Sequence, residues 1–287
     1  MPLPALSTDL LPRILTQLGH PAPAAPTPEA LASLYAAWCQ KVPFDNVQKL
    51  IHVRSSAPGP LPGSTPEHFF ENWLLHGTGG TCWAGSAALA ALLTTLGFQV
   101  RRSIATMLAA PDLQPNHGTV IVRFSPGTDY LVDTSVLHHQ PLPLHPGGIT
   151  AIAHPAWGIQ ATRQQNRWHL HWRPLHMTTG FVCRYEPLGP DHSDFPDRYA
   201  QTRDWSPFNY QVNARINRGD EVLGLAFGNA VTLHADGRTT TRPVTHRERQ
   251  AILIDQMGFS ETIARLLPED LPTPPPPTSR KAELQMA

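Results

Sequence analysis

The sequence has few cysteines and no charge imbalance, and each shortage argues against a class of protein. Three of its 287 residues are cysteine, namely Cys39, Cys82 and Cys183. So small and odd a set fits a reducing compartment better than a disulfide scaffold. The 22 basic and 22 acidic residues give a formal net charge of zero, and no basic run stands out. We therefore do not expect nucleic acid as a partner.

Long apolar segments are also missing. The longest, residues 87–93, has the length of a core helix and is too short to cross a membrane. The first residues show no basic region followed by an apolar block and a cleavage site, so we expect no secretory signal and a cytoplasmic location. Proline, in contrast, is abundant, with 31 residues. This number predicts many loops and short elements.

The most informative stretch is residues 76–97, HGTGGTCWAGSAALAALLTTLG. Three glycines precede Cys82, an apolar run rich in alanine and leucine follows it, and Gly97 ends the run. This pattern predicts a tight turn that leads into a buried helix, with the thiol at the helix N-terminus. Unpaired N–H groups and the positive end of the helix dipole favour a thiolate there. A cysteine that only packs in the core would also fit, but catalytic partners follow downstream.

The hydrophobic pattern changes along the chain. We expect helices over residues 3–19, 29–40, 67–75 and 82–96, with a polar, proline-rich loop between the second and third, up to about residue 64. Strand composition marks residues 98–108, 119–124, 130–136, 157–174 and 181–187, which predicts an antiparallel sheet or small barrel. The last third alternates apolar and polar residues. It ends in a helix whose start is marked by Thr245 and Glu248 as a capping box.

A nucleophilic cysteine needs a base and a group that orients the base. His117 begins a strand, and Asp133 interrupts an apolar strand, where a carboxylate needs a partner. If the hairpin between them turns near Ser125, Asp133 lies opposite His117 or Thr119 and can reach the imidazole; a turn centred on Gly127 would move it away. Each residue alone has a structural explanation, as a loop histidine or a backbone-bonded aspartate. Together, in the order Cys, His, Asp, they predict a catalytic triad.

These motifs resemble the arylamine N-acetyltransferase family. The matching segments are the nucleophile turn GGTCW at 79–83, the strand HGTVIV at 117–122, LVD at 131–133, VPFDNV at 42–47 and SPF at 206–208. The resemblance implies an α+β fold with a cysteine-proteinase-like core. Its parts would be an N-terminal helical bundle (1–97), a central antiparallel β-barrel (98–198) and a C-terminal α/β lid (199–270), followed by a disordered proline-rich tail (271–287).

The resemblance also implies a ping-pong reaction without a bound cofactor. Acetyl-CoA, or another acyl-CoA, would acylate Cys82, and a small amine would then take the acyl group. Phe44, Trp83 and Phe208 would lie nearest the substrate. Thr134 and Ser135 stand where the family favours a Gly-Phe-Gly stretch that lines the pocket.

Three further positions depart from the family pattern: Thr78 replaces an arginine, Ala84 a glutamate and Ser86 an asparagine. Acyl chemistry at Cys82 depends less on these residues than the choice of donor and acceptor does. Two alternatives therefore stay open. One is a transglutaminase-like or amide-hydrolysing enzyme with the same triad, and the other is a binding protein that kept the fold without turnover.

Other signals are weaker. HGTGGT lacks the Lys-Ser/Thr ending of a phosphate loop. Several histidines could suggest a metal, but no cysteine pairs accompany them, and we expect no metal; they are His138, His139, His145, His169 and His171. Cys39 and Cys183 lie in apolar contexts that favour inert packing. We expect a monomer or a homodimer.

Overall fold

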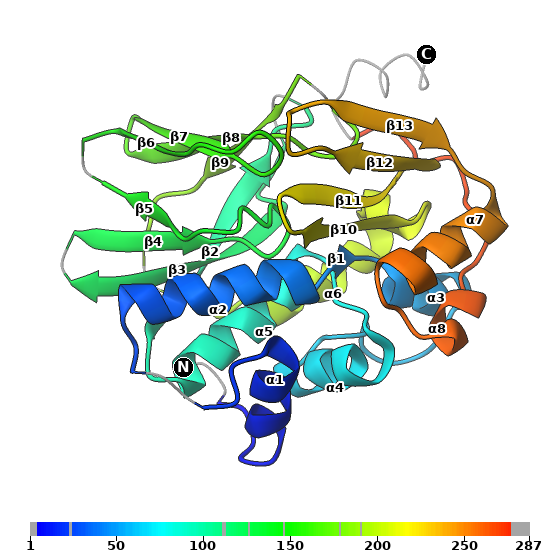
Figure 1. The fold of residues 1–287 in the computed structure, drawn as a ribbon, viewed down its shortest axis with the longest axis horizontal. Helices are drawn as coiled ribbons and strands as arrows, with labels where there is room; N and C mark the ends of the chain where they lie inside the picture. Colours follow the sequence, from blue (N-terminus) through cyan, green and yellow to red (C-terminus); the bar gives the residue numbers. More distant parts are fainter. Residues whose placement is uncertain are drawn as a thin grey trace.

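Helices and antiparallel strands form separate layers in the computed structural model, which describes residues 5–22, 25–110, 113–125, 127–145, 147–177, 179–189 and 191–276. Helices α2 and α5 lie beside a large sheet built from β2–β9, and α1 and α4 lie on the side of these helices away from the sheet (Figure 1). A second sheet contains β10–β13, and α3, α7 and α8 lie close to it (Figure 1). The predicted α+β class is confirmed.

The first part of the chain is helical, as expected. The helices are α1 (Leu10–Leu18), α2 (Pro28–Lys41), α3 (Val47–Arg54), α4 (Pro66–His76) and α5 (Cys82–Thr95). The first of them begins later than the predicted residue 3. The predicted loop before residue 64 was wrong in its first part, because α3 occupies it. This short helix looks polar in sequence, but it buries Val47 and Leu50 in a cluster with the C-terminal sheet, so tertiary packing decides its structure.

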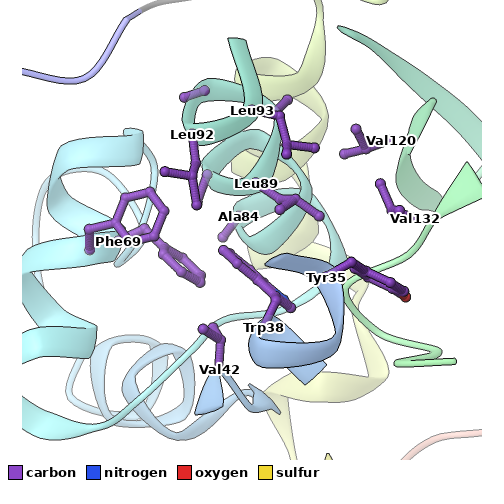
Figure 2. Packing of buried hydrophobic residues seen from close by; sticks show 14 of the residues in the cluster. Tyr35, Trp38, Val42, Phe69, Ala84, Leu89, Leu92, Leu93, Val120 and Val132 are labelled. Carbon is purple, nitrogen blue, oxygen red and sulfur yellow. The ribbon is translucent and has the colours of Figure 1, made fainter. Parts of the chain in front are cut away.

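Helix α5 is the centre of the main core. Nearly all of its side chains are buried, because an apolar surface on every side of a helix requires neighbours on every side. Leu89, Leu92 and Leu93 of α5 lie among Phe69 of α4, Trp38 of α2 and Val120 of β3 (Figure 2). This packing fixes the N-terminus of α5, where Cys82 is located.

The large sheet has the strand order β5-β4-β3-β2-β9-β8-β7-β6, with every pair antiparallel. The two edge strands, β5 and β6, were not predicted; they contact each other, so the sheet nearly closes into a barrel. The strands are β2 (Gln99–Met107), β3 (His117–Ser125), β4 (Thr128–Val132), β5 (Leu142–Leu144), β6 (Ile149–Ile152), β7 (Ile159–Gln164), β8 (Arg167–Trp172) and β9 (Phe181–Tyr185).

The second sheet has the order β1-β10-β11-β12-β13 and includes one strand from the helical region. That strand, β1 (Phe44–Asp45), pairs with β10 (Asn213–Arg218). The others are β11 (Glu221–Ala226), β12 (Asn229–Leu233) and β13 (Thr239–Pro243). Helix α7 (His246–Ala251) begins with the predicted capping box of Thr245 and Glu248. A π-helical turn η2 (Ile252–Gln256) and helix α8 (Glu261–Arg265) follow it.

Like α3, a helix after the barrel was not expected. Helix α6 (Phe195–Trp205) follows the barrel, and the 3-10 turn η1 (Pro207–Asn209) comes after it. The predicted boundary between barrel and lid falls inside α6. The division into domains stays a prediction, and the end of the predicted disordered tail, from residue 277, lies outside the described residues.

Candidate active site

The turn before Cys82 is held by the segment 43–45. Cys82 is the first residue of α5 and is 6% exposed. The backbone N–H of Gly79 donates to Asp45 Oδ2 at 2.6 Å, and the N–H of Asp45 donates to Gly80 O at 3.2 Å. A Cβ on Gly79 would lie 1.8 Å from the carbonyl oxygen of Pro43. Only glycine therefore allows the two segments to approach this closely.

Asp45 and Asn46 connect this turn to the C-terminal sheet. Asp45 Oδ1 accepts the N–H of Val47 at 2.9 Å, and burial raises the pKa of the Asp45 carboxyl to about 7. The Asn46 side chain donates to two carbonyl oxygens and accepts the N–H of Asn213 at 2.8 Å. The resemblance marked this segment, but it did not show that these side chains support the nucleophile turn. The signal in the sequence that could have indicated this role is the pair of polar residues, a carboxylate followed by an amide, in the otherwise apolar VPFDNV stretch.

His117 is the first residue of β3 and is 2% exposed. Its Nε2 lies 2.7 Å from Asp133 Oδ2, which leaves Nδ1 as the nitrogen available to the Cys82 thiol. The strand register pairs Val120 with Val132, with an irregularity between Arg123 and Ser125. Continued by one residue past the last pair, this register places Asp133 opposite Thr119, which is one of the two expected placements.

Asp133 does not interrupt a strand, as the sequence suggested, but begins the turn after β4. Its Oδ1 accepts the N–H groups of Ser135 and Val136 at 2.9 and 3.0 Å, and these bonds end the strand. Its Oδ2 accepts the hydroxyl of Tyr185 at 3.2 Å in addition to His117. Both carboxylate oxygens therefore have hydrogen-bond partners. These hydrogen bonds offset the cost of removing the fully buried carboxylate from water.

Two tyrosines that the sequence analysis missed hold Asp133 from different elements. The hydroxyl of Tyr35 donates to Asp133 O at 2.8 Å and accepts the N–H of Asp133 at 3.1 Å. Tyr35 comes from α2 and Tyr185 from β9. No short-range pattern pointed to either residue, because both contacts join distant parts of the chain.

The electrostatics favour an ion pair between His117 and Asp133. Burial lowers the pKa of His117, but the charge of Asp133 and the hydrogen bonds to Asp133 and Cys82 outweigh burial and raise this pKa to about 10. Burial likewise raises the pKa of Asp133, but the His117 charge and the hydrogen-bond donors bring it well below its usual range. Both groups are therefore charged at neutral pH.

The residues that depart from the family pattern still connect the elements of the site. Ser86 Oγ donates to Gly118 O at 2.9 Å and lies 3.2 Å from Thr134 Oγ1. Gln48 Nε2 donates to Thr78 Oγ1 at 2.5 Å. Ser86 thus joins α5 to the strand that begins with His117 and to the turn that contains Asp133.

The residues predicted to contact substrate fall into three groups. The rings of Phe44 and Phe208 meet edge to face with centroids 5.3 Å apart. Trp83 is buried against Phe195 of α6, with centroids 5.0 Å apart. Thr134 and Ser135 are buried after Asp133. The Ser135 hydroxyl is buried and has no hydrogen-bond partner among the described residues.

Comparisons with known proteins agree with this arrangement. The model of an N-acetyltransferase family matches residues 27–262, which is most of the chain and includes Cys82, His117 and Asp133. The chain belongs to the arylamine N-acetyltransferase family. A curated arylamine N-acetyltransferase of Mycobacterium tuberculosis is 27% identical over 144 residues, which are 47% of this chain and 49% of that protein. The chain thus aligns with about half the length of the curated relatives it matches.

Solved arylamine N-acetyltransferases share the fold. The Mycobacterium marinum enzyme, in complex with CoA, superposes with a TM-score of 0.74 at 19% identity over 89% of this chain and 94% of that one. The Salmonella typhimurium enzyme gives a TM-score of 0.72 at 20% identity, over 91% and 98%. The expected bundle, barrel and α/β arrangement is therefore confirmed as a fold.

The remaining candidate residues lie elsewhere. Cys39 and Cys183 are fully buried, and burial raises the pKa of Cys39 to about 12, which fits the predicted packing role. His169 and His171 lie on β8 in the barrel sheet. Within the described ranges, no three His, Cys, Asp or Glu side chains are grouped so that they could hold a metal ion. No helix in this part of the chain has the length and apolarity needed to cross a membrane.

Proposed function

We propose that this family member is an N-acyltransferase that moves an acetyl or other acyl group from a CoA-type thioester to an amine, such as an arylamine, through an acyl-cysteine. The observation that carries the proposal is the buried His117–Asp133 ion pair, whose remaining imidazole nitrogen is available to a thiol at a helix N-terminus. Curated relatives named arylamine N-acetyltransferase, and a neighbour solved with CoA, support the substrate classes.

The first half-reaction acylates the enzyme. In the starting state His117 already carries the proton given up by Cys82, and Asp133 stabilises this imidazolium. The thiolate attacks the carbonyl carbon of the acyl-CoA, and backbone N–H groups at the start of α5 stabilise the oxyanion. The C–S bond to CoA then breaks, and the leaving thiolate takes the proton from His117. The products are free CoA and an acyl thioester on Cys82.

The second half-reaction returns the enzyme to its starting state. The nitrogen lone pair of the amine attacks the acyl carbon, and His117 removes a proton from that nitrogen. The C–S bond to Cys82 breaks and an amide leaves. The proton taken from the amine stays on His117, so the thiolate and imidazolium of the starting state are restored. Phe44 and Phe208 supply the aromatic surface next to the acceptor, and the unpartnered Ser135 hydroxyl supplies a hydrogen bond.

A thioester assay tests this proposal. The purified protein is mixed with acetyl-CoA, and intact mass spectrometry should show one acetyl group, which peptide mapping should place on Cys82. Cys82→Ala should fold normally and gain no acetyl group. Cys183→Ala is the matched control and should still be acylated. Addition of an arylamine should remove the acetyl group and form an amide.

The other outcomes separate the alternatives. If Cys82 reacts with iodoacetamide but forms no thioester with any acyl-CoA tested, the acyltransferase proposal is wrong and the hydrolase or transglutaminase-like alternative gains support. If Cys82 fails to react with iodoacetamide as well, a binding role remains. Turnover by Cys82→Ala above a few per cent of the unmodified protein would contradict the triad.

A further inference from the structure

A buried serine in α5 connects the three segments that carry the triad. Ser86 is fully buried and lies four residues after Cys82, so both side chains are on the same face of the helix. A serine inside a helix commonly donates to a carbonyl oxygen of the preceding turn. The Ser86 hydroxyl instead donates to Gly118 O of β3 at 2.9 Å. This hydrogen bond therefore joins two elements.

The donors and acceptors around Ser86 follow from the number of hydrogens. The Ser86 hydroxyl has one hydrogen, which points to Gly118 O. Thr134 Oγ1 lies 3.2 Å from Ser86 Oγ, so the threonine hydroxyl donates and the serine oxygen accepts. Thr134 is 3% exposed, and its hydroxyl has no other hydrogen-bond partner within the described ranges. Its buried hydroxyl is thus satisfied through Ser86.

Both contacts of the Ser86 hydroxyl fall next to members of the triad. Gly118 directly follows His117 at the start of β3, and Thr134 directly follows Asp133 in the turn after β4. One rigid peptide unit joins each contact residue to its neighbour in the triad. Ser86 therefore holds the imidazole and the carboxylate relative to α5, whose first residue is the nucleophile.

Glycines allow the strand and the turn to approach α5 closely. A Cβ on Gly118 would lie 2.7 Å from Trp83 Cε3, and a Cβ on Gly85 would lie 2.8 Å from Thr134 Oγ1. A side chain at either place would force the strand or the turn away from the helix. The contacts around Ser86 are therefore closely packed, and a change in its hydrogen bonds is transmitted to the neighbouring triad residues.

We infer that Ser86 is a positioning residue, whose hydroxyl holds the His117 imidazole in place beside the Cys82 sulfur. Thr134 acts through Ser86, because Ser86 is the partner of its hydroxyl. An imidazolium stabilises a thiolate strongly only at short distance, so a small displacement lowers the reactivity of the sulfur. This role refines the proposed function and rests on it.

The test is the rate of iodoacetamide alkylation at Cys82 as a function of pH, followed by peptide mass in Ser86→Ala and in the unmodified protein. Without the hydroxyl the imidazolium is held less closely, so less thiolate forms and the rate at pH 7 should fall about tenfold. The two rates should converge at alkaline pH, where the thiolate forms without the imidazolium.

Thr95→Val is the matched control. It removes a hydroxyl from the last residue of the same helix, where the hydroxyl donates to Ala91 O at 2.8 Å. The control therefore loses the same kind of hydrogen bond far from the sulfur, and its profile should match that of the unmodified protein. A Ser86→Ala profile that overlies the Thr95→Val profile overturns the inference. A loss of rate that is equal at every pH also overturns it, because it would show altered access to the sulfur.

Thr134→Val tests the second hydrogen bond. It removes the hydroxyl with little change of shape and should slow alkylation at pH 7 several-fold, and Thr134→Ser should restore the rate. The double variant with Ser86→Ala should react no more slowly than Ser86→Ala alone, because the threonine acts through the serine. Multiplied effects in the double variant would show that Thr134 acts independently, which contradicts this part of the inference.

Two outcomes need a separate readout. If Ser86→Ala does not fold, as judged by circular dichroism, Thr134→Val decides, and an unchanged Thr134→Val profile overturns the inference. Alkylation needs no acyl-CoA. Failure of the thioester assay would therefore reject the proposed function, while the alkylation profile would still report on Ser86.

Discussion

Asp133→Asn should reveal the His117–Asp133 ion pair through the pH dependence of stability. The change keeps the shape of a fully buried side chain and removes its charge. In the unmodified protein the pKa of His117 rises from 6.5 to about 10. Without the Asp133 charge, burial dominates and the imidazole becomes neutral at pH 7.

The sign and size follow from linkage. A raised histidine pKa stabilises the folded state fully below the unfolded value of 6.5, and this stabilisation is lost as the pH rises through about 10. The lowered pKa of Asp133 adds stability above about pH 4, which is lost as the pH falls. At about 1.4 kcal/mol per pH unit, the histidine contribution is on the order of 5 kcal/mol. The stability gap between the two proteins should therefore be widest near pH 5–6 and narrow towards pH 10.

Urea unfolding at a series of pH values from 5 to 10 measures this gap. Asp129→Asn is the matched control, because Asp129 pairs with two arginines and with no histidine; its gap should stay constant over the same pH range. A gap for Asp133→Asn that is independent of pH would show that His117 is not an imidazolium in the folded protein. The same variant should form the Cys82 thioester at least about 100-fold more slowly.

Two further variants test the supports of the site. Gly79→Ala places a methyl group against Pro43 O, so the free energy of unfolding in urea should fall by about 2 kcal/mol and Cys82 alkylation should slow. Gly147→Ala is the control, because a Cβ there meets nothing within 4 Å, and it should change neither quantity. Equal effects of the two substitutions would contradict the close approach of Gly79 to Pro43. Tyr185→Phe removes the hydroxyl donor to Asp133 and should cost about 1 kcal/mol of stability and slow thioester formation several-fold. Unchanged thioester kinetics would show that this hydroxyl does not position Asp133.

The parts of the site that the sequence predicted have short-range signals. Glycines beside a cysteine and an alanine- and leucine-rich run mark the turn and α5 within twenty residues. Thr27 and Thr245 mark helix starts within one turn, and both side chains cap as expected. His117 at a strand start and Asp133 in the next segment required only the geometry of one hairpin.

The parts that it missed depend on contacts between distant segments. Helix α3 has a polar surface pattern and gains stability only when Val47 and Leu50 meet the C-terminal sheet. Asp133 interrupts an apolar run, so the turn that it begins looked like continued strand. Lys49 in isolation resembles an exposed lysine, and only the packing of α6 over α3 shows that it is buried.

The hydrogen bond between Asn46 and Asn213 has a consequence for folding during synthesis, because it joins residues 167 positions apart. The segment that holds the nucleophile turn cannot pair with β10 until that strand has left the ribosome. Contacts of such long range also slow folding. Chains that stop just after the last barrel strand, β9, would therefore contain all three members of the predicted triad yet lack the support that positions the sulfur. Reactivity should arise only in chains long enough to include β10.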